Sequence, residues 1–345
     1  MIGPIVLNKK SKGIHLEKRY KFSSEILPDV FKITLPLPGR KPGPVNVYLF
    51  KGREITLIDT GTLQSAPVLE KALAEHQLGF SDIKKIIITH GHPEHYGAAD
   101  QIAKAGRAKV IAHREDQKSI ENGMDVSSKR YKDYLLLTGI PLYVGVMLKM
   151  LSVLFRHMAE NCRVAMTVQE GDRIPLGRYE ATIIETPGHT KGSIGLFLEK
   201  EKMLFCGDTL IEHITPNAFV MLEEGEKLPL RSSQKEFYRS LEKIKSLSPS
   251  VAFSAHGKDI RDVSGIIEGY RSAFAQRKEA VLSIIRSGEK NVYRTARKLF
   301  PDIGGVRLPL EIFLSISETY TTMQVLQEEG KIKMDIRRGR LEVTC

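Results

Sequence analysis

Short apolar runs bounded by charged or turn-forming residues recur along most of the chain. The segments 30–35 and 45–50 alternate or run apolar like a pair of strands, and 83–89 is a short isoleucine-rich run typical of a buried strand. Leucines and alanines at helical spacing predict helices over 67–78 and 96–105. Strands that alternate with helices indicate an α/β fold.

The C-terminal part follows a different pattern, in which helical spacing dominates. It predicts one long helix, two further helices and a β-hairpin, over 264–288, 292–300, 308–329 and 331–344. This order is similar to a winged helix. The helix in the position of a recognition helix, 308–329, carries four glutamates and no Lys or Arg. Because a helix that faces phosphates should be basic, nucleic-acid binding is not favoured over a structural or dimerising role.

The most distinctive polar residues follow the predicted strands. His90, His92, Glu94 and His95 crowd into six positions directly after the run 83–89. Four other predicted strands end in an acid or a histidine beside a glycine, namely Asp59, His189, Asp208 and His256. Imidazole nitrogens and carboxylate oxygens are the ligands that zinc and similar divalent metals take. The sequence therefore predicts a metal site where these strand ends meet.

This ordered set resembles the metallo-β-lactamase superfamily, whose loop signature is His-x-His-x-Asp-His. The resemblance covers roughly 28–260 and implies an αββα sandwich with two zinc ions per chain. It assigns His90, His92 and His189 to the first metal. It assigns the second metal, the carboxylate between the two metals and an acid that orients ligands to the remaining residues, namely Glu94, His95 and His256, Asp208, and Asp59. Asp59 and Asp208 are thus the catalytic candidates.

Glu94 departs from the signature, which has aspartate at this position. Glutamate is one methylene longer, and metal–oxygen distances tolerate only a few tenths of an ångström. An intact site with two metals is the simpler expectation. A shifted or weak second metal, or iron or manganese in its place, stays open.

The implied activity is hydrolysis of a thioester, ester or lactone by a metal-bound hydroxide. A phosphodiesterase or ribonuclease acting on RNA is the alternative, prompted by the C-terminal domain and the charge distribution. If Glu94 disables the second site, a mononuclear iron dioxygenase or a binding-only protein is the third interpretation.

Composition narrows the picture only slightly. The chain has 345 residues and a net charge of +11, and three scattered cysteines give no disulfide framework. Residues 1–45 carry +6 and residues 271–345 carry +5, so the segment between them is neutral. No signal peptide is evident at the N-terminus, and we expect a cytoplasmic protein.

One apolar stretch, 134–155, approaches the length of a membrane span. Gly139, Pro141, Gly145 and Lys149 interrupt it, and it lies between two metal motifs, so no transmembrane span is expected. We expect instead a helical insertion over about 114–160 whose apolar face serves as a lid, a homodimer contact or a pocket for a small-molecule substrate with an apolar moiety.

The predicted organisation is therefore a catalytic domain over 1–270 that contains this insertion. A small winged-helix-like domain over 271–345 follows it.

Overall fold

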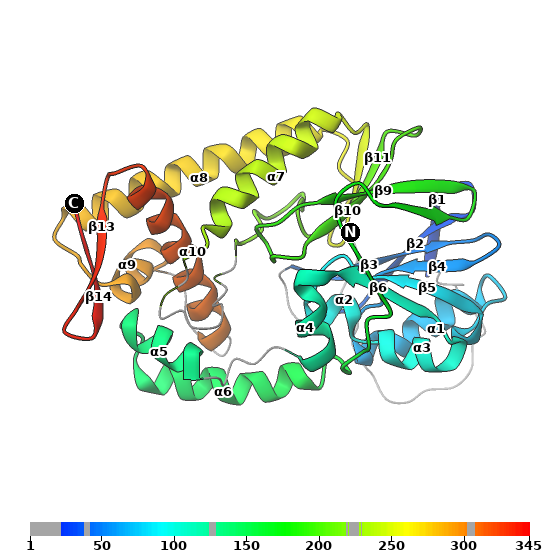
Figure 1. The fold of residues 1–345 in the computed structure, drawn as a ribbon, viewed down its shortest axis with the longest axis horizontal. Coiled ribbons are helices and arrows are strands. Elements are labelled where there is room, and N and C mark those ends of the chain that lie inside the picture. The colour runs from blue at the N-terminus through cyan, green and yellow to red at the C-terminus, as the bar shows by residue number, and fades with distance from the viewer. Residues whose placement is uncertain are drawn as a thin grey trace, which may run out of the picture.

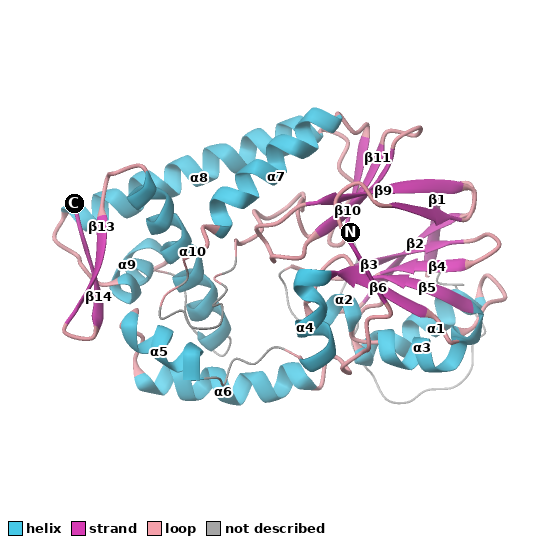
Figure 2. Cartoon of the chain, in the orientation of Figure 1, coloured by secondary structure: helices cyan, strands magenta, loops and turns pink. Residues whose placement is uncertain are grey.

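The computed structural model describes residues 22–37, 42–123, 129–218, 220, 228, 230–301 and 308–345. The basic N-terminal stretch before Phe22 lies outside the described residues. Most strands gather at one end of the molecule, and the other end consists of helices and the C-terminal hairpin (Figures 1 and 2). In the part of the chain that is described, no helix is both long enough and apolar enough to cross a bilayer.

The larger sheet has seven strands in sequence order. It consists of β1 (Ser23–Leu27), β2 (Val30–Leu35), β3 (Val45–Phe50), β4 (Ile55–Ile58), β5 (Ile83–Ile87), β6 (Lys109–His113) and β7 (Met166–Val168). The first four strands pair antiparallel, and β4 to β7 pair parallel. The parallel arrangement brings the carboxyl ends of β4 and β5 to the same edge of the sheet.

The second sheet has five strands in the order β12-β11-β10-β9-β8. These strands are β8 (Arg173–Leu176), β9 (Tyr179–Glu185), β10 (Ile194–Leu198), β11 (Met203–Gly207) and β12 (Val251–Ser254). Only β11 and β12 pair parallel, so their carboxyl ends also share one edge.

The two sheets pack face to face with helices outside, which confirms the predicted αββα arrangement. Tyr48 and Phe50 of β3 lie between the sheets, whereas Val47 and Leu49 of the same strand face the helices. Every residue of β3 is therefore buried, as the apolar run 45–50 suggests.

Helices cover both outer faces. The first sheet is covered by α1 (Ala66–Ala74), α2 (Pro93–Tyr96), α3 (Ala99–Gly106) and α4 (Arg114–Asn122), and the second by α7 (Ser233–Leu247) and the first half of α8 (Val263–Arg286). Ile120 of α4 belongs to the core beneath the first sheet, so α4 is part of the sandwich.

A separate core lies at the far end of α8. It joins α8 to α5 (Lys129–Leu137), α6 (Leu142–Arg156), α9 (Val292–Leu299), α10 (Leu308–Glu328) and the hairpin of β13 (Lys333–Arg337) and β14 (Arg340–Thr344). Helix α8 contributes Phe274 to the core of the sandwich and Val281 to this second core, so the predicted boundary at 270/271 falls inside one continuous helix. The division into two domains and the winged-helix character stay predictions.

The helices α5 and α6 share the second core with the C-terminal helices. Tyr134, Ile140 and Val144 are buried there, and α6 contacts α10. The other side of α6 is exposed and apolar, with Leu142, Val146 and Met150 at 77, 53 and 69% exposure. The predicted apolar face therefore exists, but the opposite side of α5 and α6 packs into the second core.

The packing of α6 against the second core predicts that shortening two valines of this helix changes the free energy of unfolding by different amounts. Val144→Ala should lower the free energy of unfolding by about 2 kcal/mol, because Val144 is 1% exposed and its methyl groups fill the second core. The matched control, Val146→Ala, should change it by less than about 0.5 kcal/mol because that side chain is exposed. Urea unfolding of both variants measures the difference. Equal effects would show that α6 does not dock in this way.

Candidate metal centre

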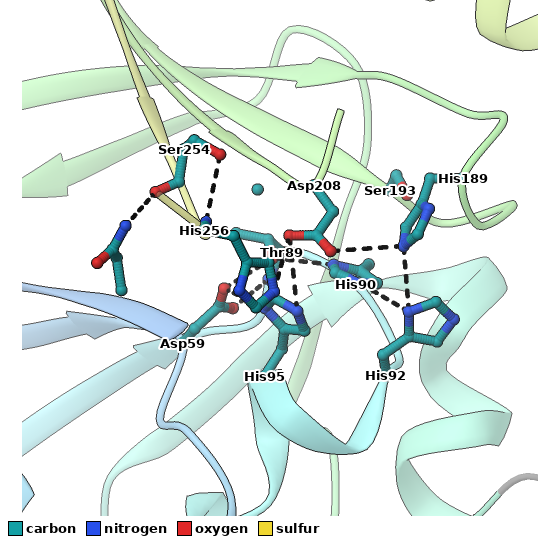
Figure 3. A network of polar contacts seen from close by, with 12 residues as sticks. Asp59, Thr89, His90, His92, His95, His189, Ser193, Asp208, Ser254 and His256 are labelled. Carbon is teal, nitrogen blue, oxygen red and sulfur yellow. Dashed lines mark hydrogen bonds and ion pairs between the residues drawn. The ribbon is translucent and has the colours of Figure 1, made fainter. Parts of the chain in front are cut away.

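All seven predicted metal ligands meet at one edge of the sandwich. They follow β5, β9, β11 and β12, and Figure 3 shows six of them converging. They form three overlapping groups, and in each the ligand atoms lie within 4.8 Å of one another: His90, His92 and His189; His90, His95 and Asp208; and Glu94, His95 and His256. The three groups together contain all seven residues.

The first group is compact. His92 Nδ1 lies 3.0 Å from His90 Nε2 and 3.1 Å from His189 Nε2. Three nitrogens bound to one tetrahedral zinc at 2.0–2.1 Å would be about 3.3 Å apart. The observed spacing is within a few tenths of an ångström of that value, so these residues fit a metal ion.

The imidazoles of three histidines point at Asp208 (Figure 3). The Nε2 atoms of His95 and His256 lie 3.7 and 3.5 Å from Asp208 Oδ1, and His189 Nε2 lies 3.7 Å from Oδ2. His95 Nε2, His256 Nε2 and Asp208 Oδ1 are buried and have no hydrogen-bond partner in the described structure. Because buried polar atoms without partners are costly, these three fit a shared cation.

The opposite nitrogen of each of these rings is anchored. His95 Nδ1 lies 2.8 Å from Asp59 Oδ2, His189 Nδ1 3.0 Å from Asn217 O, and His256 Nδ1 3.0 Å from Pro44 O. An Nδ1–H that donates to an oxygen leaves Nε2 as the nitrogen that faces the centre and can bind a metal once it is deprotonated.

Asp59 is held in place for this task. Its Oδ1 accepts the Thr89 N–H at 2.8 Å, and its Oδ2 accepts the Thr89 hydroxyl at 2.8 Å as well as His95 Nδ1. It is 1% exposed, and its φ of 60° lies in the left-handed region that aspartate tolerates better than most residues. Asp59 thus acts on His95 and does not join the ligand groups.

Burial sets the protonation of the first group. It is the main cause that lowers the pKa of His90 and His92 well below 6.5, and the neighbouring imidazoles lower it further. Burial likewise lowers the pKa of His189. These imidazoles are therefore neutral at neutral pH, which is the form that binds metals.

Charge, and not burial, decides the protonation of His95 and Asp208. Burial favours the neutral form of both His95 and Asp208, but charge outweighs it. The carboxylates of Asp59 and Asp208 raise the pKa of His95 to about 9, and the surrounding imidazoles lower the pKa of Asp208. Asp208 is thus ionised, and a cation between it and His95 Nε2 would displace the proton of that ring.

Glu94 lies at the margin of the centre. It sits in the first turn of α2 and is only partly buried, whereas His95 and His256 are fully buried. It joins a group with those two histidines but not with Asp208.

A further histidine and a cysteine at or near the ends of strands of the sandwich lie outside the three ligand groups. His113 Nε2 lies 2.9 Å from Glu185 Oε1, a contact that links β6 to β9. Cys206 is buried, and burial raises the pKa of its thiol to about 12, so it remains a thiol.

Sequence reasoning missed the groups that hold the ligands. Thr89 follows the strand run without any special signal, and the carbonyl groups of Pro44 and Asn217 carry none. Asp116 accepts hydrogen bonds from two of the ligand loops, but it lies in a polar stretch of the sequence in which nothing distinguishes it from its neighbours.

A family model of the metallo-β-lactamase superfamily matches residues 40–256. The chain belongs to the metallo-β-lactamase superfamily. A probable metallo-hydrolase of Bacillus subtilis, YqjP, is 30% identical over 312 residues, which cover 88% of this chain and 94% of that protein. A hydroxyacylglutathione hydrolase of Rhodospirillum rubrum is 26% identical over 208 residues, covering 59% of this chain and 61% of that protein.

Structure comparison agrees. A metallo-β-lactamase family protein of Thermus thermophilus superposes with a TM-score of 0.79 at 25% identity, covering 93% of this chain and 99% of that one. Membership of this superfamily makes the chain an enzyme of the metallo-hydrolase kind, with histidine and aspartate groups suited to divalent metals.

Removing the carboxylate of Asp208, which faces imidazoles of both halves of the centre, should affect both halves. Asp208→Ala should weaken zinc binding more than about 100-fold, beyond the 10–100-fold typical of residues that only support ligands. Metal analysis after dialysis against a chelator measures this, with Asp335→Ala on the exposed hairpin as the control. Two metals retained in Asp208→Ala would show that the carboxylate does not lie between them.

Glu94 should selectively influence metal binding by its own group, which it forms with His95 and His256. We expect the native second metal to be weaker or partly occupied, and Glu94→Asp to raise the metal content or the hydrolytic rate, because the shorter side chain restores the usual reach. Stepwise metal titration separates the two sites. Two equally tight metals in the native protein, both weakened by Glu94→Asp, would identify the glutamate as the better ligand here.

Proposed function

We propose that this chain is a dinuclear metal-dependent hydrolase that cleaves a thioester, ester or lactone. The observation that carries the proposal is the meeting of His95 Nε2, His256 Nε2 and Asp208 Oδ1, all buried without partners among the described residues, beside the triad of neutral imidazoles. Such a set of atoms is costly in a protein interior unless a cation binds there.

The proposed ligand assignment follows the observed groups. His90, His92 and His189 would hold the first metal, and Glu94, His95 and His256 the second, with Asp208 shared. Zinc is the expected metal, with iron or manganese as the alternative at the second position. When bound, two such ions would lower the pKa of a water toward neutrality and polarise the substrate carbonyl.

The other polar groups position these ligands. Asp59 fixes the ring of His95, and the carbonyl groups of Pro44 and Asn217 fix His256 and His189. Tyr96 donates its hydroxyl to Ser119 O at 3.3 Å and is 2% exposed, which supports packing over a part in the reaction.

A thioester is the favoured substrate class. One relative is named a hydroxyacylglutathione hydrolase, an enzyme of thioester cleavage, although it covers only 59% of this chain. The exposed apolar face of α6 supports a substrate with an apolar moiety, and the same face is the candidate homodimer contact.

RNA is a weaker candidate than the sequence alone suggested. Helix α10 is buried along most of its described length, and its Glu318 pairs with Arg277 of α8 at 2.6 Å. A helix enclosed in this way supports a structural role over entry into a nucleic-acid groove. A cytoplasmic location agrees with the free thiols of Cys162, Cys206 and Cys345.

A substrate panel tests the proposal. The metal-loaded protein should hydrolyse acyl-glutathione thioesters or lactones faster than phosphodiesters or RNA. A chelator should abolish that activity, and added zinc should restore it. Activity should be insensitive to salt, because recognition of an acyl group does not require phosphate contacts. Salt-sensitive cleavage of RNA would favour the phosphodiesterase interpretation, and consumption of O₂ would favour the dioxygenase.

A further inference from the structure

Asp116 links two loops that sequence reasoning treated separately. It lies in the first turn of α4 and is 1% exposed. Its Oδ2 accepts the Gly91 N–H at 2.7 Å and the Thr190 hydroxyl at 2.7 Å, and its Oδ1 accepts the Gly192 N–H at 2.9 Å. One buried carboxylate thus receives three hydrogen bonds from two loops.

These two loops carry the whole first ligand group. Gly91 lies between His90 and His92, and Thr190 follows His189 directly. Asp116 itself belongs to none of the three ligand groups. Its hydrogen bonds therefore set the separation of the loops without occupying a ligand position.

The glycines in these loops fit this arrangement. A Cβ at Gly192 would lie 2.6 Å from Asp116 Cγ and 2.7 Å from its main-chain nitrogen, and a Cβ at Gly91 would lie 3.3 Å from Asp116 Cβ and 3.0 Å from the Ser119 hydroxyl. Glycine at both positions lets the main chains approach the carboxylate this closely.

We propose that Asp116 is a positioning residue that holds the His90–His92 loop and the His189 loop at the spacing needed for the first metal. The inference rests on the proposed metal binding but not on the proposed substrate. A carboxylate suits the position because both of its oxygens accept hydrogen bonds, whereas the amide of asparagine replaces one acceptor with a donor.

A neighbouring contact supplies the control. Glu115 on the same helix pairs with Lys191 of the same loop at 2.8 Å, but both side chains are about one-third exposed (32% and 34%). Exposed pairs of this kind contribute little, so Glu115→Gln should leave the loop in place.

The test compares zinc affinity of the full-length chain by competition with a chelator. Asp116→Asn keeps the shape, but its amide N–H₂ must face either the Gly91 N–H or the Gly192 N–H. We expect zinc affinity of the first site to fall about 10–100-fold in Asp116→Asn. Thr190→Val, which removes one donor of the three, should give a smaller loss, and Glu115→Gln should give none.

Unfolding of each metal-free variant separates positioning from general stability. A lower melting temperature of metal-free Asp116→Asn with unchanged zinc affinity would overturn the proposal, as would equal affinities in Asp116→Asn and Glu115→Gln. If Asp116→Asn does not fold, an unchanged zinc affinity in Thr190→Val overturns it instead. A native protein that binds two zinc ions but cleaves no thioester, ester or lactone would refute the proposed function alone.

Discussion

The structure depends on burying many ionisable groups at one point. Asp59 and Asp116 are stable there because main-chain N–H groups and side-chain donors satisfy their oxygens. Asp208 differs, since its surroundings are imidazole nitrogens at 3.5–3.7 Å and its Oδ1 has no hydrogen bond within the described residues. A buried carboxylate surrounded by imidazoles is compensated best by a cation, which explains why the sandwich encloses so polar a centre.

The fold provides this centre through parallel pairing. Strands β4 and β5 of one sheet and β11 and β12 of the other each pair parallel, so their loops emerge at common edges, and the face-to-face packing brings the two edges together. The Tyr48 hydroxyl donates to Ser254 O at 2.6 Å and joins the sheets beside His256. The rest of the chain supports this geometry, and α8 connects it to a second core in which the insertion and the C-terminal helices meet.

Local signals predicted much of this organisation. The strands over 30–35 and 45–50 and the C-terminal hairpin lie where the apolar pattern places them, and the seven ligand candidates converge. The ligand set came from a family resemblance, since periodicity alone supports only an α/β fold. Contacts between distant segments were not predictable: no local feature of α6 indicates that Val144 packs into a core shared with α10, and none marks Asp116 as the partner of Gly91 and Gly192.

The ligand groups are held in two ways, by hydrogen bonds between loops and by anchors of single rings. The first group depends on the relative position of two loops, both bonded to Asp116. Single rings of both halves also have anchors of their own, His189 on the carbonyl of Asn217, His95 on Asp59 and His256 on the carbonyl of Pro44. None of these contacts involves Glu94, so a longer side chain at this position leaves them in place.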